Sequence, residues 1–373
     1  MTGRDCCILF NMISGVGFVK FNSLSRYFDD PADALNASVS ELMQVRGIGE
    51  ILAREIAGWR DKYDLEAEKE RAAAGGAAII TLADTDYPAV LRQIPDPPLC
   101  LYAAGTLPDF DAKDFIAIVG SRRASNYGCR VARSLTEQAV ASGWGTVSGL
   151  AFGIDFCAHD ATVKSGGVTV AVLGGGLGRI HPQEHVPLAK SIIASGGAVV
   201  SEYPMLFPVS RNSFPRRNRI IAALSRGVLV AEAAKKSGGI ITANLAIDYG
   251  KAVFAVPGNI DNPMAEGCNE LLKNGAAKLT TSFRDVIEEF DPGAAPDLFS
   301  LAEPHSEYQA ESGGNFSENE LKIIAMLREK GESSFDDLAI ASDFQPGQLS
   351  GLLAALEMKF AILQLPGRRY MLR

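Results

Sequence analysis

The sequence lacks the two patterns that would direct a protein into or across a membrane. It has no apolar stretch of about 20 residues, the length that a helix needs to span a bilayer. It also does not start with a basic segment followed by a short apolar run, which is the pattern of a secretory signal. We therefore expect a cytoplasmic protein without membrane insertion.

Patterns typical of metal sites and of common catalytic sites are missing as well. The six cysteines form no CxxC pair, and His181 and His185, four residues apart, have no nearby cysteine to complete a ligand set. There is no GxxxxGK[ST] loop and no GxGxxG fingerprint, which argues against an ATPase or a dehydrogenase. Asp155 and His159 share a helix face, but we interpret them as a helix cap and a core hydrogen-bonding residue. We predict no metal, no cofactor and no enzymatic activity.

The overall charge excludes a protein that is basic over its whole surface. The chain has 36 Lys and Arg against 44 Asp and Glu, a net charge of -8, so a nucleic-acid site would have to be a local patch. One segment, residues 203–231, has no Asp or Glu and contains five arginines: Arg211, Arg216, Arg217, Arg219 and Arg226. We predict that these arginines meet an anion. For Arg217 and Arg219 a salt bridge to Glu202 or Glu232 is the open alternative.

Composition divides the chain into four parts. Residues 1–75 predict a small helical domain, SAM-like or helix-hairpin-helix-like, because amphipathic runs are broken by "SGVG" and "RGIG". Residues 76–290 form the central domain, and residues 291–316, rich in Pro, Ala, Ser and Gly, predict a linker. Residues 317–373 predict a winged-helix domain. Within it we expect helices at 318–327, 335–341 and 345–358, followed by a two-stranded hairpin.

The central part alternates short β-branched runs with helical stretches. The runs are "FIAIVGSR", "GTVSGLAFGID", "VTVAVLGGG", "GAVVSEYP", "GVLVAEAA" and "KAVFAVPGN". Strands that are apolar along their whole length are buried on both faces, which is typical of a parallel sheet with helices on either side. We predict an α/β fold with a Rossmann-like, doubly wound, mainly parallel sheet.

Glycine-rich turns follow four of these strands, at 119–122, 148–153, 174–178 and 237–239. Glycine allows close backbone approach, and a helix N-terminus carries a partial positive charge, so such turns favour phosphate. Because the carboxyl ends of parallel strands meet at one edge of a sheet, the four turns predict one phosphate-binding crevice. Phe214, just before the helix that Pro215 opens, would either stack on a base or act as a hydrophobic staple.

Seven motifs follow one another along the chain: "VGSRRASNYG", "VSGLAFGIDFCAH", "AVLGGGLGRIHP", "SEYP", "FPRRNRIIAALS", "GGIITANLAIDYGKAVFAVPGN" and "GCNELLKNGA". In this order they resemble the DNA-processing protein A (DprA/Smf) family over residues 82–281. The resemblance implies a protein that binds single-stranded DNA during natural transformation, forms a homodimer through its Rossmann-like domain and helps to load the RecA recombinase.

The resemblance also implies which residues would contact DNA. Carried over by position, they are Gly120, Ser121, Arg122, Ser148, Gly149, Gly174, Gly175, Gly176, Arg216, Arg217, Asn218, Arg219, Ser237, Gly238 and Lys273. The chain departs from the family pattern at Gly178, where an acidic residue is usual, and at His181, where an aromatic residue is usual. Near Gln183 the family often has a basic residue, and at Gly239 a serine.

The flanking parts give weaker indications. "VRGIGEILA" resembles a helix-hairpin-helix turn, but Glu50 stands where a basic residue would help, so DNA contact and packing both stay open. The expected helix at 345–358 has no Lys or Arg, which favours a protein partner, while Arg368 and Arg369 could make a minor DNA contact.

Two other functions remain as alternatives. Rossmann-like nucleotide phosphoribohydrolases share the opening strand and the phosphate crevice, but they typically show PGGxGTxxE where this chain continues from Pro257 and Gly258 into Asn259 and Ile260. A pure interaction scaffold with a vestigial crevice is the other possibility.

Overall fold

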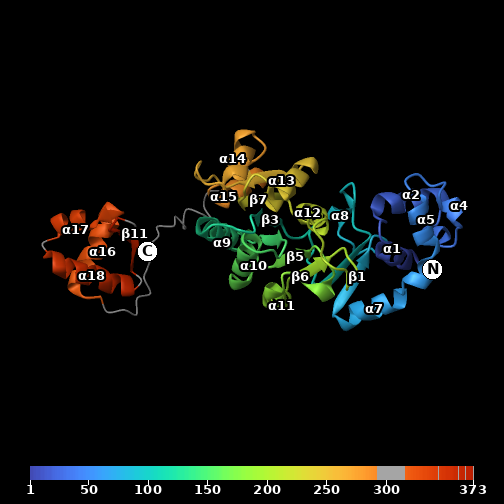
Figure 1. The fold of residues 1–373 in the computed structure, drawn as a ribbon, viewed down its shortest axis with the longest axis horizontal. Coiled ribbons are helices and arrows are strands. Elements are labelled where there is room, and N and C mark those ends of the chain that lie inside the picture. The colour runs from blue at the N-terminus through green and yellow to red at the C-terminus, as the bar shows by residue number, and fades with distance from the viewer. Residues whose placement is uncertain (292–315, 343, 360, 366, 373) are drawn as a thin grey trace. The chain divides into compact units, whose positions relative to one another are not determined.

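The computed structural model describes residues 1–291, 316–342, 344–359, 361–365 and 367–372. It contains two compact units, Met1–Ala294 and Ala295–Arg373, which are described separately below (Figure 1). Nearly all of the predicted linker, residues 292–315, lies outside the described residues. Within the described part of the chain, we find no helix with the length and hydrophobicity to cross a bilayer.

The first unit begins with seven helices. They are α1 (Gly3–Met12), α2 (Phe18–Phe28), α3 (Pro31–Ala34), α4 (Val39–Leu42), α5 (Glu50–Ala57), α6 (Trp59–Lys62) and α7 (Leu65–Ala74). Gly15 and Gly47, in the two glycine turns noted in the sequence, both have a φ of +86°, which side-chain-bearing residues rarely adopt. Gly17 and Gly49 then precede α2 and α5. The two turns therefore share the same backbone conformation at their first glycine, and each is followed by a helix.

The centre of this unit is a nine-stranded sheet. Its strands are β1 (Ala77–Thr81), β2 (Cys100–Gly105), β3 (Phe115–Gly120), β4 (Gly145–Ser148), β5 (Thr169–Leu173), β6 (Ala198–Ser201), β7 (Gly227–Glu232), β8 (Ala252–Ala255) and β9 (Lys278–Leu279), in the order β1-β2-β6-β5-β4-β3-β7-β8-β9. From β6 to β9 all neighbours are parallel, whereas β1 and β2 are antiparallel additions at one edge. The predicted Rossmann-like, mainly parallel fold is confirmed, and the six predicted strands are β3 to β8.

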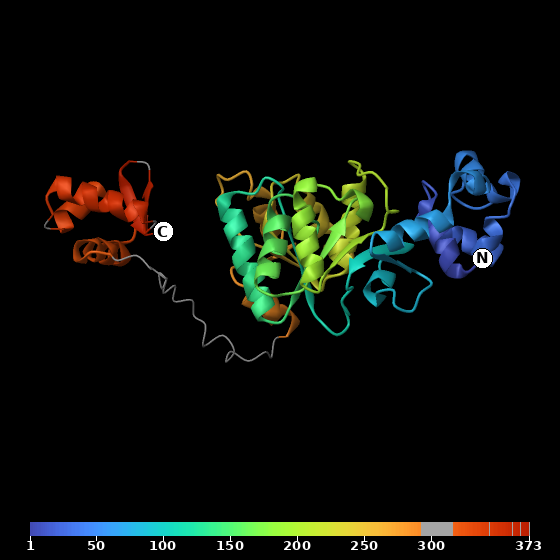
Figure 2. The ribbon, with the colours of Figure 1, turned by 90° about the horizontal axis from the view of Figure 1, so that it is seen from below.

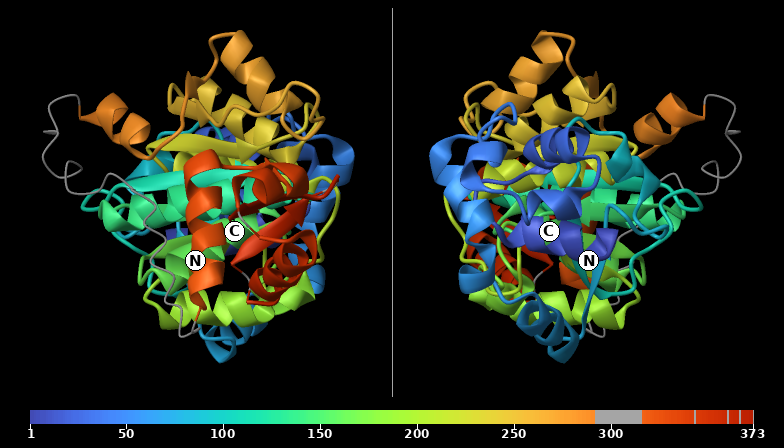
Figure 3. Two further views of the ribbon diagram at one scale, coloured as in Figure 1. Left: turned by 90° about the vertical axis from the view of Figure 1, so that its left-hand side faces the viewer. Right: turned by 90° about the vertical axis from the view of Figure 1, so that its right-hand side faces the viewer.

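Helices cover both faces of this sheet. They are α8 (Ala89–Arg92), α9 (Asn126–Ala141), α10 (Ile154–Lys164), α11 (Val186–Ala194), α12 (Ser213–Ala223), α13 (Gly238–Asp248), α14 (Glu266–Lys273) and α15 (Arg284–Phe290), with the 3-10 turns η1 (Leu177–Arg179) and η2 (Gln183–His185). Alternation along β3 divides its side chains between the faces: Ile116 and Ile118 join the core under α9 and α10, and Ala117 and Val119 join the core under α12 and α13. Figure 2 shows the green helices α9 to α11 side by side over one face, and Figure 3 shows the yellow and orange helices over the other.

The N-terminal helices share a core with the sheet. Ile8 and Leu9 of α1 belong to the same buried cluster as Ile79 of β1 and Val199 of β6. Asn11 donates a hydrogen bond to the backbone oxygen of Glu202 at 2.9 Å. These contacts fix α1 against the β1–β6 edge of the sheet.

The described residues of the second unit form three helices, α16 (Glu318–Lys330), α17 (Phe335–Ala341) and α18 (Pro346–Met358), and a small antiparallel sheet in the order β10 (Ser333–Ser334), β12 (Arg369–Leu372), β11 (Ile362–Leu365). Ser317 and Ser334 each form a capping box at the start of a helix. The three predicted helices and the final hairpin are confirmed. The assignment as a winged-helix domain stays a prediction.

Candidate functional site

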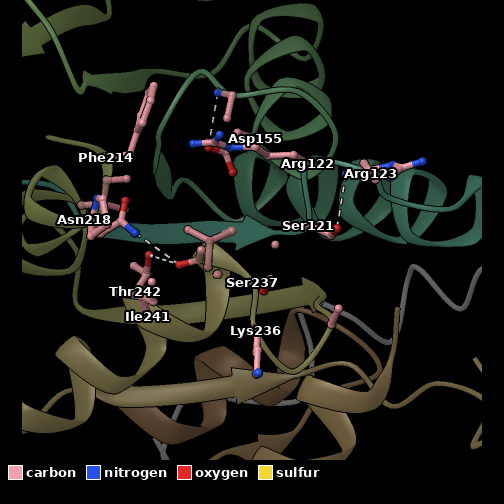
Figure 4. A pocket seen from close by; sticks show the side chains of 18 of the residues that line it. Ser121, Arg122, Arg123, Asp155, Phe214, Asn218, Lys236, Ser237, Ile241 and Thr242 are labelled. Carbon is pink, nitrogen blue, oxygen red and sulfur yellow. Dashed lines mark hydrogen bonds between the residues drawn. The ribbon is translucent and has the colours of Figure 1, made fainter. Parts of the chain in front are cut away.

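The carboxyl edge of the sheet is hollowed where the direction of winding reverses, between β3 and β7. Strands β3 and β7 are neighbours, and the connections after them lead to opposite faces, which makes this the switch point where α/β sheets bind ligands. A cavity of about 500 Å³ lies there. We call it the switch-point cavity; it is lined by Val119, Gly120, Ser121, Arg122, Arg123, Ala151, Asp155, Arg211, Phe214, Pro215, Arg217, Asn218, Ile221, Ala234, Lys236, Ser237, Gly238, Gly239, Ile241, Thr242 and Met264 (Figure 4).

Four exposed cations surround the mouth of this cavity: Arg122, Arg123, Arg211 and Lys236. No ion pair joins any of them to a carboxylate among the described residues. Arg122 lies over the ring of Phe214, with its guanidinium carbon 4.6 Å from the ring centroid. The Arg123 and Lys236 side chains extend away from the other labelled residues, from the loops after β3 and β7 (Figure 4). The mouth therefore carries positive charge that the described part of the protein does not neutralise.

The N-terminus of α13 opens onto the same cavity. Its N-cap residue, Ser237, makes no capping hydrogen bond, and its hydroxyl is buried without a partner in the structure. A buried hydroxyl without a partner costs free energy, so its presence at a cavity wall points to a ligand that supplies the partner. A Cβ at Gly238 would meet no atom within 4 Å, so the backbone there is accessible. Helix N-termini with accessible N–H groups bind anions.

Arg217, at the start of the second turn of α12, lies in the wall of the cavity but is 3% exposed. Its guanidinium donates to the backbone oxygens of Gly149, at 2.6 Å, and Val172, at the ends of β4 and β5. Burial lowers the pKa of Arg217 to about 10, and the charge of Asp155 opposes that shift. Arg217 thus ties α12 to the sheet and presents little of its surface to a ligand.

Arg219 and Arg216 are paired with the carboxylate of Glu202, so the anion that each of them meets in this structure belongs to the protein. Arg219 forms two hydrogen bonds with the buried carboxylate of Glu202, at 2.8 and 2.7 Å. Burial lowers the pKa of Arg219, but the charge of Glu202, these hydrogen bonds and the charge of Asp96 together raise it. The Arg216 guanidinium is 3.5 Å from Glu202, and a Cβ at Gly17 of the N-terminal helices would lie 3.1 Å from it. Arg226 pairs with Asp114 at 2.9 Å. For Arg219 the alternative of a salt bridge to Glu202 is the one observed.

The loop Gly174–Gly176 packs against protein and does not line the switch-point cavity. It lies against residues 203–212, the segment between β6 and α12 that we call the strap. A Cβ at Gly176 would lie 2.1 Å from the backbone oxygen of Pro204, and the Gly176 N–H donates to Phe207 at 3.0 Å. At Gly174 a Cβ would be 2.9 Å from the Phe214 ring. These glycines allow close backbone approach to the strap and α12, so the expectation of direct DNA contact is not supported by their position.

The loop after β4 is held by buried polar groups. The Asp155 carboxylate accepts from the N–H groups of Gly149, at 3.1 Å, and Ala151, at 3.4 Å, and burial raises its pKa. Ser148 is fully buried and donates to the backbone oxygen of Ile118. Leu150 has a φ of +54°, a conformation uncommon for a residue with a side chain. Asp155 therefore fixes the loop from the first turn of α10, whereas the N-cap position that we predicted for it is occupied by Gly153.

The two glutamates considered as partners for arginine have different roles. Glu202 holds Arg219, whereas Glu232 accepts hydrogen bonds from the Ser125 N–H, at 2.7 Å, and its hydroxyl, at 2.6 Å. The latter contacts tie the end of β7 to the start of α9. They fix the loop that carries Ser121 and Arg122.

The histidines support the core, as predicted for His159. It is buried, contacts the Thr169 hydroxyl through Nδ1 at 2.8 Å, and its pKa is lowered by burial to about 3. His185 contacts the Leu150 oxygen through Nδ1 at 2.8 Å and packs against Phe152 and Phe156. Among the described residues, no three His, Cys, Asp or Glu side chains are grouped closely enough to hold a metal ion.

The structure thus brings together about half of the residues expected to contact DNA. Those lining the switch-point cavity are Gly120, Ser121, Arg122, Arg217, Asn218, Ser237 and Gly238, and those outside the lining are Ser148, Gly149, Gly174, Gly175, Gly176, Arg216, Arg219 and Lys273. Asn218 donates to the Gly238 oxygen at 3.2 Å and so links α12 to α13. The list of expected DNA contacts omitted Arg123, Arg211 and Lys236, although Arg211 belongs to the arginine-rich segment that we predicted to meet an anion. The available signal for Arg123 and Lys236 was their position in the short turn between a strand and the next helix.

Comparison with known proteins agrees with this architecture. The sequence profile described as "DNA recombination-mediator protein A" matches residues 78–291, more than half of the chain. The chain belongs to this family. A Synechocystis member, Protein Smf, is 33% identical over 98% of both chains, and the Bacillus subtilis DNA processing protein DprA is 40% identical over 57% of this chain and 71% of its own.

Solved structures of family members have the same fold. DNA processing protein A from Streptococcus pneumoniae is 32% identical, with a TM-score of 0.65 over 78% of this chain and 98% of its own. The Helicobacter pylori member, described for its single-stranded DNA binding mode, is 30% identical, with a TM-score of 0.52 over 58% of this chain and 97% of its own.

Proposed function

We propose that this member of the family binds single-stranded DNA in the switch-point cavity. The observation that carries the proposal is the Ser237 hydroxyl, which is buried beside the accessible N-terminus of α13 and has no hydrogen-bond partner among the described residues. The mouth of the same cavity has four cations that the described part of the chain does not pair with a carboxylate. A phosphate oxygen would satisfy the hydroxyl and the helix N-terminus, and adjacent phosphates would meet the cations. The Helicobacter relative, described by its single-stranded DNA binding mode, supports this choice of ligand.

The lining of the cavity favours a single strand over a duplex. Phe214, Ile221 and Ile241 give it apolar walls, which suit an unstacked base. In a duplex the bases are stacked and paired, so they could not enter without disrupting it. Readout would depend on phosphates and on the faces of bases, so we expect little sequence preference.

We propose binding rather than catalysis. Among the lining residues the carboxylate is Asp155, which is buried and already accepts two backbone hydrogen bonds. It is therefore poorly placed to act as a general base toward a ligand in the cavity. The phosphoribohydrolase alternative would be supported if free base were released from nucleoside monophosphates.

Family membership supports a proposal for the wider role. We propose that the protein acts in the cytoplasm as a homodimer formed through the Rossmann-like domain, protects incoming single strands and helps to load the RecA recombinase in natural transformation. The winged-helix and N-terminal units would make protein or minor DNA contacts.

Fluorescence anisotropy with labelled single-stranded and double-stranded oligonucleotides over a salt series tests the core of the proposal. If four cations each contact a phosphate, the slope of log K against log salt for a single strand is about -2.8, and a fourfold rise in salt weakens binding about fifty-fold. Equal affinity for the duplex, or a flat response to salt, would contradict the proposal.

A further inference from the structure

Helices α9 and α10 lie side by side on one face of the sheet, each after one of two neighbouring parallel strands (Figure 2). They therefore run in the same direction. Arg133 of α9 faces Asp160 of α10, with 4.0 Å between the guanidinium Nε and a carboxylate oxygen. About one turn earlier on each helix stand Cys129 and Cys157, each the fourth residue of its helix. The ion pair thus sets a register in which the two cysteines face each other.

The two thiols are in contact. A hydrogen bond joins the thiols of Cys157 and Cys129, and both side chains pack in the buried cluster under α9 and α10 that contains Ile118. Burial, followed by this hydrogen bond, raises the pKa of Cys157 to about 12. A disulfide requires two cysteine side chains that point toward each other from neighbouring backbones. Cys129 and Cys157 meet this requirement, and both are free thiols in the structure.

The two cysteines differ in their access to solvent. Cys129 is partly exposed, whereas the other five cysteines of the chain are buried, and Cys157 is 2% exposed. A small oxidant therefore reaches the Cys129 sulfur first and finds Cys157 directly behind it. An accessible cysteine with a second cysteine next to it is the arrangement in which oxidation ends in a disulfide.

We propose that Cys129 and Cys157 are a modification site for peroxides, at which oxidation forms a reversible disulfide between α9 and α10. In the first step the Cys129 thiolate attacks an oxygen of hydrogen peroxide, the O–O bond breaks, one water leaves and Cys129 becomes a sulfenic acid. In the second step the Cys157 sulfur attacks the Cys129 sulfur and the S–O bond breaks. The hydroxyl leaves with the Cys157 proton as a second water. The two thiols lose two electrons, which the peroxide accepts, and a small-molecule thiol restores them.

The disulfide would join the two helices that support one side of the cavity mouth. The Ile154 N–H at the start of α10 donates to the Ser121 oxygen at 3.2 Å, and the loop from Ser121 leads into α9. A bond between the first turns of these helices closes this arrangement covalently and restricts the unfolded chain, so the urea midpoint should rise. Neither cysteine lines the switch-point cavity, so the inference does not depend on the proposed function.

Peptide mapping of the full chain after treatment with hydrogen peroxide tests the proposal. Trypsin cuts at Arg130 and Arg133, so Cys129 and Cys157 lie in different peptides unless a disulfide joins them. Free thiols are blocked by alkylation, and the peptides are analysed by mass spectrometry without reduction. The variant Cys157→Ser removes the second thiol of the pair, and Cys268→Ser is the control, because it removes a buried thiol elsewhere in the fold.

We expect the unmodified protein and Cys268→Ser to lose two hydrogen atoms per chain and to yield the linked Cys129–Cys157 peptide. Their urea midpoint should rise on oxidation and return with dithiothreitol. In Cys157→Ser no linked peptide should form, and Cys129 should proceed to the sulfinic acid. The proposal is overturned if Cys129 of the unmodified protein stays a thiol, if it accumulates as the sulfinic acid, or if the disulfide joins other cysteines or two chains.

Discussion

Two groups of cations lie along the same edge of the sheet and differ in what holds them. On α12, Arg217 and Arg219 are buried and bonded to backbone oxygens or to Glu202. On the loops around the cavity mouth, Arg122 and Lys236 are exposed and have no carboxylate partner among the described residues. The first group holds the site together, and the second is available to a ligand.

The comparison predicts its largest effect for Glu202→Ala. The change leaves the buried Arg219 guanidinium without its main counter-charge, and breaking a buried pair in this way costs about 3 to 5 kcal/mol. Urea denaturation measures the loss of unfolding free energy. The control is Asp114→Ala, because its pair with Arg226 is exposed on both sides and should be worth less than about 1 kcal/mol. Equal losses for the two variants would break the distinction between the groups.

Glycines also divide into those packed against the protein and those open to a ligand. The Gly176→Ala variant tests the packed group. The new methyl would collide with the backbone oxygens of Pro204 and Met205 in the strap, and such overpacking costs about 1 to 3 kcal/mol. Urea denaturation should show this loss, while the DNA affinity of the folded fraction stays within about twofold. A stable variant that has lost DNA binding would instead place this loop in the DNA site.

The Gly238→Ala variant tests the group of glycines that is open to a ligand. A methyl there meets no atom of the protein, so stability should not fall, but it stands where we propose that a phosphate approaches α13. Anisotropy should show about tenfold weaker binding of a single strand, equivalent to the loss of one charge-assisted hydrogen bond. Unchanged affinity would argue that the phosphate does not sit at this helix N-terminus.

A further prediction concerns pH. His159 is buried, and burial together with the charge of Arg217 lowers its pKa to about 3, from an ordinary value of 6.5. Between pH 6.5 and pH 3, His159 therefore binds a proton in the unfolded chain but not in the folded chain. The contribution of neutral His159 to the unfolding free energy is complete above pH 6.5 and is lost as the pH falls toward 3. The slope is at most about 1.4 kcal/mol per pH unit. Urea denaturation between pH 7 and pH 5 should show this slope in the unmodified protein and a smaller one in His159→Gln; equal slopes would mean that His159 is not the responsible group.

Much of the fold could be predicted because it depends on local pattern. The uniformly apolar runs specify β3 to β8, and the glycine turns mark the helix starts after them. Strands β1 and β2 were not predicted, because they precede the region where the strand–helix alternation is regular and are added to the sheet by antiparallel pairing with β6. Partners that lie far away in sequence cannot be read from local pattern.

The site was predicted only in part for the same reason. Arg219 and Arg122 both lie in sequence patterns that favour phosphate binding. Of these two arginines, Arg219 is neutralised by carboxylates distant along the chain, Glu202 and Asp96, whereas Arg122 has no such pair among the described residues. Likewise, Gly176 and Gly238 both lie in glycine-rich turns after a strand, so the sequence does not distinguish them. In the structure the strap packs against Gly176 and leaves Gly238 open. Lys273 is at the end of α14 and does not line the cavity, although the family resemblance suggested it.

The most direct test of the account compares Arg122→Ala/Lys236→Ala with Lys273→Ala in single-stranded DNA binding over a salt series. The account predicts that the double variant loses two phosphate contacts and about 1.4 from the slope of log K against log salt, while Lys273→Ala keeps the slope of the unmodified protein. A double variant that is folded and retains the full slope and affinity would contradict the claim that the cations at the cavity mouth bind the DNA backbone.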